Sequence, residues 1–221
     1  IVARKDSPFS MIRVACYIRE VDKAIALCDM IMDKGYETTV NIMAVSIVPE
    51  RELNEGLELL AESEVGSIYL VDSFGALYSE QVHYLVRKYL HYARAAGKEV
   101  GIHAHNNLQL AFANTIEGII LGANYLDATM AGLGRGAGNC PMELLVGFLH
   151  NPKYNLRPVL DCVQNHIEPM RAKLLWGYAL PYLLTGLLNQ HPRTAIKFKE
   201  AELKGVKGDV LEFYDSITEE E

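Results

Sequence analysis

The sequence predicts an α/β protein built on a parallel sheet, because strand-like and helix-like segments alternate along the chain. Successive strand-like segments begin about 30 residues apart with an amphipathic segment between them, which is the spacing of βαβ units. Glycines such as Gly35 stand where the expected helices end, as left-handed capping residues do. Half of the 221 residues are hydrophobic, so the chain can bury a substantial core.

Each element follows from a local pattern. Val, Ile, Tyr and Thr are frequent in the five expected strands, which cover residues 12–17, 39–45, 67–72, 99–103 and 125–130. The expected helices carry one apolar stripe each and cover residues 22–34, residues 50–63, a segment that Ser79 opens and Gly97 ends, and residues 107–121 before Gly122. These elements form a series of five βα units.

The strand ends distinguish between two architectures that contain such units. The first strand leads into Arg19 and Glu20 without the glycine-rich turn that a doubly wound nucleotide-binding sheet uses. Polar residues instead follow successive strands, first Asp72 and Ser73, then residues 103–106. A (β/α)₈ barrel builds its site from all of its strand ends, so the sequence favours a barrel. About five of its eight units are present and the N-terminal strands are missing.

The composition changes after residue 149. Residues 150–158 contain two prolines and two asparagines and are expected to connect two parts of the chain. The sequence therefore predicts an incomplete barrel domain over residues 1–150 and a small helical appendage with a frayed tail over residues 151–221. Pro169 and Pro181 are expected to interrupt the helices of the appendage.

Charge and cysteine content exclude several classes of protein. The net charge of −7 offers no basic surface for a nucleic acid, and apolar runs such as residues 144–149 are far too short to span a membrane. The four cysteines are widely spaced and form no Cys-x-x-Cys pair. We therefore expect a soluble protein of the reducing cytoplasm, with neither a nucleic acid nor a membrane as partner.

Two histidines stand two residues apart at the end of the fourth expected strand. Side chains at that spacing share one face of a strand, so His103 and His105 can project together toward a divalent metal ion. The alternative is a pair of imidazoles that only form hydrogen bonds in a polar loop, since histidine serves both roles.

Three blocks of sequence carry a specific resemblance. Residues 71–75 (VDSFG), 101–107 (GIHAHNN) and 127–141 (DATMAGLGRGAGNCP) resemble, in the same order, the metal-dependent aldolase and acyl-lyase superfamily of HMG-CoA lyase-like barrels. The similarity is greatest to the 4-hydroxy-2-oxovalerate aldolase branch and covers most of residues 10–150. It implies a (β/α)₈ barrel in which the five units correspond to strands four to eight.

The resemblance implies roles for individual residues. In the family the two histidines bind a divalent cation, which makes His103 and His105 metal ligands for Mn²⁺ first, with Mg²⁺, Co²⁺ or Zn²⁺ as alternatives. Some branches add the asparagine of the glycine loop, here Asn139, although three glycines in five residues also suit a flexible turn. Asp72 and Ser73 correspond to residues that line the substrate pocket, although an aspartate there can also cap a helix.

Two further residues follow from the same comparison. Asn107 closes the histidine block and is expected to bind substrate. Tyr178 lies in a Gly-Tyr-Ala run like that of the aldolase branch, where a tyrosine acts as a catalytic acid–base group. Aromatic packing is the alternative for Tyr178 and its neighbours.

The implied activity is that of a divalent-metal-dependent aldolase, a carbon–carbon lyase that cleaves or forms a 4-hydroxy-2-oxo acid through a metal-stabilised pyruvate enolate. Two alternatives stay open: a Claisen-type acyl-CoA synthase or lyase, and a non-catalytic barrel scaffold. The first strand of the family supplies an aspartate ligand and an arginine, followed in the aldolase branch by a histidine. This chain contains no such run, so we expect it to be a segment of a longer protein.

The expected partner is a small 2-oxo acid substrate. A homo-oligomer is compatible with the resemblance. The aldolase branch also uses its C-terminal domain to pass an aldehyde to a dehydrogenase, and the short appendage here argues against an aldehyde dehydrogenase partner.

Overall fold

The computed structural model describes residues 1–219, and Glu220 and Glu221, the end of the predicted tail, lie outside the described residues. The chain divides into two compact units, which are considered separately. The sheet unit comprises Ile1–Asp72, Ser79–His103 and Thr115–Leu126. The C-terminal unit comprises Ser73–Tyr78, Ala104–Asn114 and the chain from Asp127 onward.

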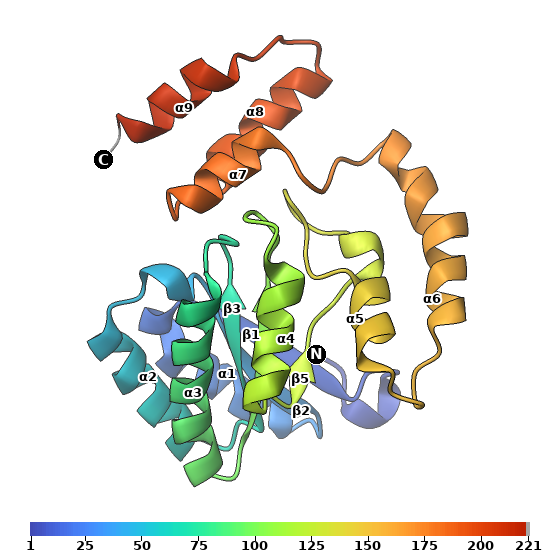
Figure 1. Ribbon diagram of the computed structural model, residues 1–221. Helices are drawn as coiled ribbons and strands as arrows, with labels where there is room; N and C mark the ends of the chain where they lie inside the picture. The colour runs from blue at the N-terminus through green and yellow to red at the C-terminus, as the bar shows by residue number, and fades with distance from the viewer. Residues whose placement is uncertain (220–221) are drawn as a thin grey trace. The chain divides into compact units, whose positions relative to one another are not determined.

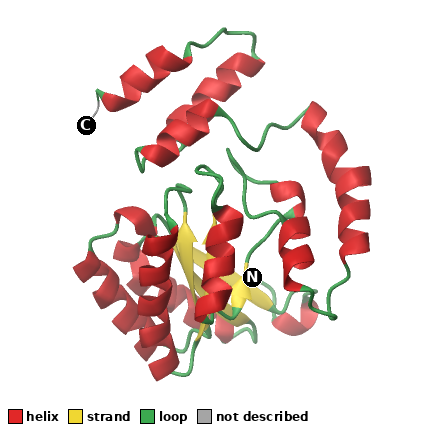
Figure 2. Ribbon diagram, viewed as in Figure 1, coloured by secondary structure: helices red, strands yellow, loops and turns green. Residues whose placement is uncertain are grey.

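A five-stranded sheet, yellow in Figure 2, is the centre of the sheet unit. Its strands are β1 (Met11–Cys16), β2 (Glu37–Ile42), β3 (Ser67–Asp72), β4 (Glu99–Ala104) and β5 (Tyr125–Leu126). The helices that follow the first four strands are α1 (Val21–Met32), α2 (Glu50–Glu62), α3 (Ser79–Ala95) and α4 (Ala111–Leu121) (Figure 1).

The strands lie in the sheet in the order in which they occur in the sequence, β1-β2-β3-β4-β5. The pairs β1–β2, β2–β3 and β4–β5 are parallel. Right-handed crossovers that always move to the next strand in one direction place their helices on one face of the sheet. A doubly wound sheet reverses its strand order and carries helices on both faces. The strand order therefore confirms the predicted barrel wall and excludes the doubly wound alternative.

The two faces of the sheet differ in chemistry. Val14, Val40 and Ile68 are opposite one another on three neighbouring strands and are buried. Their neighbours in sequence point to the other face. There the guanidinium of Arg13 lies 4.0 Å from the ring centre of Tyr69.

Tyr69 also stacks on Tyr125, with ring centres 6.0 Å apart. The layer of Arg13, Tyr69 and Tyr125 thus comes from β1, β3 and β5, and layers built from alternate strands fill the interior of a barrel. Gly101 belongs to this layer because a Cβ there would overlap the Tyr69 ring.

Most predicted boundaries agree with the structure, and three differ. Gly35, Gly97 and Gly122 end their helices with positive φ, as expected. The second strand lies at Glu37–Ile42, earlier than predicted, and the fifth has only two residues. The fourth helix begins at Ala111 rather than at residue 107.

The late start of α4 has a local cause. Gln109 has φ +61°, which is incompatible with an α-helix. The side chain of Asn106 accepts a hydrogen bond from the backbone N–H of Ala111 at 3.1 Å and so caps the helix from outside it.

The C-terminal unit is mainly helical. Its helices are α5 (Met142–Leu149), α6 (Leu156–Cys162), α7 (Leu180–Leu187), α8 (Arg193–Leu203) and α9 (Val210–Thr218). One apolar cluster joins α7, α8 and α9 to a single residue of the glycine loop, and its members are Ala137, Tyr182, Ala195, Phe213 and Ile217. Pro181 lies in the first turn of α7, where its missing N–H costs no hydrogen bond, so it begins a helix rather than interrupting one.

None of the helices within residues 1–219 is both long enough and apolar enough to cross a membrane.

Candidate metal and substrate site

The strand β4 positions the two predicted histidines. His103 is the last residue but one of β4, and His105 follows the end of the strand. Both are partly buried. The boundary between the two units falls between His103 and Ala104. Within the C-terminal unit, His105 forms an isolated antiparallel β-bridge with Asn139. Two residues that were predicted to bind metal, 34 positions apart, are therefore direct backbone neighbours.

The side-chain amide of Asn139 is oriented by its own hydrogen bonds. Asn139 is only 9% exposed, and its Nδ2 donates to the carbonyl of Leu133 at 3.2 Å. Its Oδ1 is buried, and no donor among residues 1–219 contacts it. A buried carbonyl oxygen without a partner costs about 1–3 kcal/mol. Amide oxygen is a suitable ligand for Mg²⁺ or Mn²⁺, so the observed orientation fits a metal ligand.

The glycine loop, residues 134–139, is packed against the histidine block. The backbone N–H of Asn106 donates to the carbonyl of Gly138 at 2.9 Å. Gly138 has φ +84°, and a Cβ there would overlap the carbonyl oxygen of Gly132. Glycine is required at this position for both reasons. The loop is mostly buried from Gly136 onward.

The first predicted block reaches the same region. Asp72 is buried at the end of β3, with 1% exposure. The next residue, Ser73, accepts a hydrogen bond through its carbonyl from Nη2 of Arg135 at 2.8 Å. The carbonyl of Gly75 accepts one from the N–H of Leu108 at 3.1 Å. The C-terminal unit therefore brings together residues from all three sequence blocks.

Asn107 is held by the appendage. It is 2% exposed, and its Nδ2 donates to the carbonyl of Tyr182 in α7 at 3.1 Å. A Cβ on Gly186, one turn further along α7, would be 3.0 Å from the Cβ of Asn107. Alanine at position 186 would therefore require Asn107 or Leu108 to move by a few tenths of an ångström.

The aromatic residues of the appendage divide into two kinds. Trp176 and Tyr182 are buried, with 8% and 5% exposure, as the packing interpretation predicts. Tyr178 lies between them in sequence and is 61% exposed. Its phenol is therefore open to solvent before α7 begins.

No sequence motif identifies one further residue of this region, His191. The ring of His191, in the turn after α7, contacts the ring of Phe74 with centres 5.5 Å apart. Burial, followed by the positive charges of Arg135 and Arg193, holds the pKa of His191 below its usual value. His191 belongs to no motif, and only the folded chain places it beside the first sequence block.

The candidate ligands within residues 1–219 are two imidazoles and one amide. No three His, Cys, Asp or Glu side chains in this range lie close enough together to hold a metal ion.

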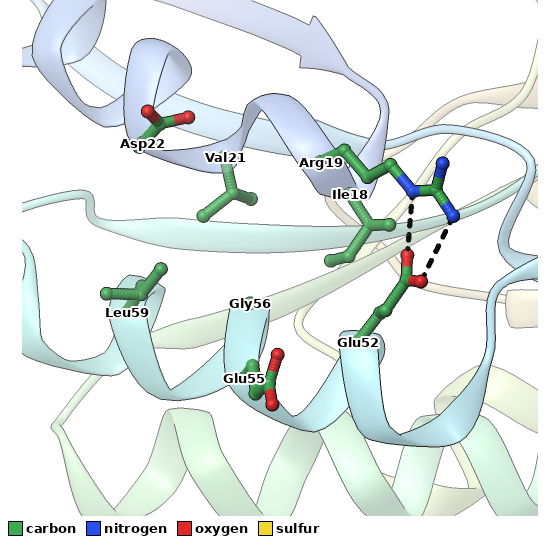
Figure 3. A pocket seen from close by; sticks show the side chains of 8 residues that line it. All are labelled: Ile18, Arg19, Val21, Asp22, Glu52, Glu55, Gly56 and Leu59. Atoms are coloured by element: carbon green, nitrogen blue, oxygen red, sulfur yellow. Dashed lines mark hydrogen bonds and ion pairs between the residues drawn. The ribbon is translucent and has the colours of Figure 1, made fainter.

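The sheet unit also has a groove that none of the predicted site residues lines (Figure 3). It is lined by Ile18, Arg19, Val21, Asp22, Glu52, Glu55, Gly56 and Leu59. Arg19 donates from Nε and Nη2 to the two carboxylate oxygens of Glu52, at 3.0 and 3.1 Å. Because these charges satisfy each other and none of the three sequence blocks lines the groove, we do not assign it a catalytic role.

The chain is similar to known proteins over the region that contains the three sequence blocks. The model of the family described as HMGL-like matches residues 11–167. The chain is 34% identical over 194 residues to 4-hydroxy-2-oxovalerate aldolase 3 of Rhodococcus opacus, and the match covers 82% of this chain and 57% of the relative. The chain spans about half the length of the curated relatives it matches.

Two solved structures have a similar fold. The N-terminal domain of a putative aldolase from Bacteroides vulgatus superimposes with a TM-score of 0.76 at 32% identity, covering 86% of this chain and 63% of that one. The HMG-CoA lyase of Bacillus subtilis superimposes with a TM-score of 0.64 at 17% identity, covering 77% of this chain and 69% of that one. The second comparison supports the fold alone.

Proposed function

Because the chain belongs to the HMGL-like family, we propose that the whole protein is a divalent-metal-dependent aldolase that cleaves or forms a carbon–carbon bond in a 4-hydroxy-2-oxo acid. The aldolase names of the curated relatives favour this reaction over acyl-CoA condensation and over a non-catalytic scaffold.

The observation that carries the proposal is the bridge between His105 and Asn139, together with the unpartnered, buried Oδ1 of Asn139. A buried polar atom without a partner calls for an explanation, and a bound ion is one. Among residues 1–219 the amide oxygen of Asn114 is also buried without a donor, and what distinguishes Asn139 is its bridge to His105. A cation beside His105 would satisfy that oxygen.

In the proposed site His103, His105 and Asn139 hold the metal, with Mn²⁺ as the first candidate and Mg²⁺, Co²⁺ or Zn²⁺ as alternatives. The two histidines are expected to converge because residues two apart on extended backbone share a face. When bound, the cation supplies a Lewis acid that polarises the 2-oxo acid. A carboxylate outside this chain is expected to supply a further protein ligand.

The other predicted residues receive roles that fit their surroundings. Asp72 and Ser73 are proposed to line the substrate pocket at the end of β3. Asn107 is proposed to support the substrate site by fixing the histidine block to α7. Retro-aldol cleavage removes a proton from the 4-hydroxyl and returns one to carbon. Tyr178, whose phenol is exposed, is the proposed proton carrier.

The protein is further proposed to function in the cytoplasm and to act on a small molecule. Cys16, Cys28 and Cys140 are buried as thiols, which suits a reducing compartment. A homo-oligomer is the proposed assembly.

The test is an assay of the full-length protein with Mn²⁺ and 4-hydroxy-2-oxo acids of several chain lengths, with coupled detection of pyruvate. We expect pyruvate release, and a loss of about 100-fold or more in kcat/KM for His105→Ala and Asn139→Ala. Asn165→Ala is the matched control, since Asn165 is exposed and its Nδ2 donates to Asp161 at 2.9 Å. Absence of pyruvate with every substrate and metal would reject this reaction.

A further inference from the structure

The segment that precedes α7 and the first turn of α7 contact the glycine loop, or the turn just before it, at three points. Nε1 of Trp176 donates to the carbonyl of Ala131 at 2.9 Å. The backbone N–H of Gly177 donates to the carbonyl of Gly136 at 3.1 Å. The ring of Tyr182 lies where a Cβ on Gly136 would be only 3.3 Å away.

These contacts continue directly to the candidate metal ligand. The Ala131 that accepts from Trp176 adjoins Gly132, and the carbonyl of Gly132 accepts the N–H of Asn139 at 3.0 Å. A Cβ on Gly138 would be 3.6 Å from Cδ1 of Trp176. Trp176 therefore lies beside Gly138, the residue before Asn139. Its hydrogen bond to Ala131 is next to Gly132, whose carbonyl accepts the backbone N–H of Asn139.

The position of Trp176 is itself fixed by a charged neighbour. The guanidinium of Arg171 stacks 4.1 Å from the Trp176 ring centre, and its Nη1 donates to the Trp176 carbonyl at 3.3 Å. The Nε of Arg171 in turn donates to the carboxylate of Glu168 at 3.0 Å. The Trp176 indole is thus held by its hydrogen bond to Ala131 and by the stacked Arg171, which limits its movement away from the glycine loop.

The apolar core of the appendage includes the loop as well. Ala137, between Gly136 and Gly138, belongs to the same cluster as Tyr182, Ala195 and Phe213. The glycine loop thus folds as a part of the appendage.

We propose that Trp176 is a positioning residue for Asn139, so that the helical appendage determines the cation affinity of the candidate metal site. The inference rests on the proposed function, because it assumes that Asn139 binds the metal. Removing a partner that orients a metal ligand typically lowers metal affinity by about 10- to 100-fold, and we expect an effect of this order for Trp176.

The first test measures Mn²⁺ affinity of the full chain by electron paramagnetic resonance of free Mn²⁺. Trp176→Phe keeps one aromatic ring, removes the Nε1 donor and makes the side chain smaller, and we expect its dissociation constant to rise about tenfold. At limiting Mn²⁺ the activity of this variant should fall, and excess Mn²⁺ should restore it. Tyr214→Phe is the matched control, because Tyr214 is 41% exposed in α9 and loses only a solvent-facing hydroxyl.

A second measurement uses Trp176, which is the one tryptophan of residues 1–221, and its signal in the full-length protein is the fluorescence that Trp176→Phe removes. Mn²⁺ is paramagnetic and should quench the fluorescence of Trp176 in the wild type and in Tyr214→Phe. Asn139→Ala should abolish the quenching at the same Mn²⁺ concentration.

The outcomes separate the two proposals. If the wild type binds Mn²⁺ and Asn139→Ala does not, but Trp176→Phe binds as tightly as the wild type, the positioning role is wrong and the metal site stands. If the full-length wild-type protein binds no divalent cation, the proposed function fails, and the positioning role fails with it.

Discussion

Asn107 and Tyr182 are 75 residues apart in sequence, and Nδ2 of Asn107 donates to the Tyr182 carbonyl at 3.1 Å. The hydroxyl of Thr185 donates to the same carbonyl at 3.0 Å. All three residues are buried. The Tyr182 carbonyl therefore connects α7 by a hydrogen bond to the block of sequence that contains the two histidines.

Replacing Asn107 with Leu should lower the stability of the protein. The substitution keeps the branched shape, although leucine is the larger side chain, and it removes a buried hydrogen bond, which contributes about 1 kcal/mol, while Thr185 still satisfies the carbonyl. We expect the Tm to fall by about 2–4 °C. Calorimetry measures this, with Asn165→Leu as an exposed control. An unchanged Tm would mean that this bond adds nothing to folding.

Gly138 and Gly205 form a matched pair for the glycine loop. Both have positive φ, +84° and +83°, so alanine is strained at either site by about 1–2 kcal/mol. Only at Gly138 does a Cβ overlap the carbonyl of Gly132, because nothing lies within 4 Å of the Cβ at Gly205. Gly138→Ala should therefore destabilise the protein more than Gly205→Ala in urea denaturation. Equal losses would indicate that the loop yields without cost.

The barrel wall was predictable because its signals are local. Apolar stripes and strand-like runs gave the order of the elements, and Gly35, Gly97 and Gly122 marked three helix ends. The errors are local as well. The left-handed conformation of Gln109 delays α4, and nothing in the apolar pattern of that helix indicates it.

The candidate site was predictable only in part. His103, His105 and Asn139 stand in motifs, so their chemistry is visible in the sequence. The contacts of Trp176 with Ala131 and of His191 with Phe74 join residues far apart in the chain. No periodicity or spacing encodes such contacts, because they arise only when the appendage folds onto the glycine loop.

The titration of His191 should respond to its charged neighbours. Burial, Arg135 and Arg193 lower its pKa, and Nδ1 accepts the N–H of Arg193 at 3.1 Å, which requires that nitrogen to be unprotonated. The pKa measured by NMR should therefore be below the usual value of about 6.5 and should rise in Arg193→Gln. Lys197→Gln, one turn further along α8, is the control.

The same shift predicts how stability depends on pH. His191 takes up a proton more readily in the unfolded chain, so its contribution to the free energy of unfolding is complete above about pH 6.5 and declines as the pH falls below it. Arg193→Gln should reduce the decline. A pKa for His191 at or above the usual value would contradict the observed environment.

Added metal should stabilise the folded protein if His105 and Asn139 bind it. A ligand that binds only the native state at 100 times its dissociation constant contributes about 2.7 kcal/mol, and a chelator removes that contribution. We therefore expect Mn²⁺ to raise the Tm of the full-length wild type by several degrees, and EDTA to reverse the change. His105→Ala should lose the response, whereas His166→Ala should keep it, because His166 is exposed and lies outside the three sequence blocks. An equal rise in both variants would show that Mn²⁺ binds elsewhere on the protein.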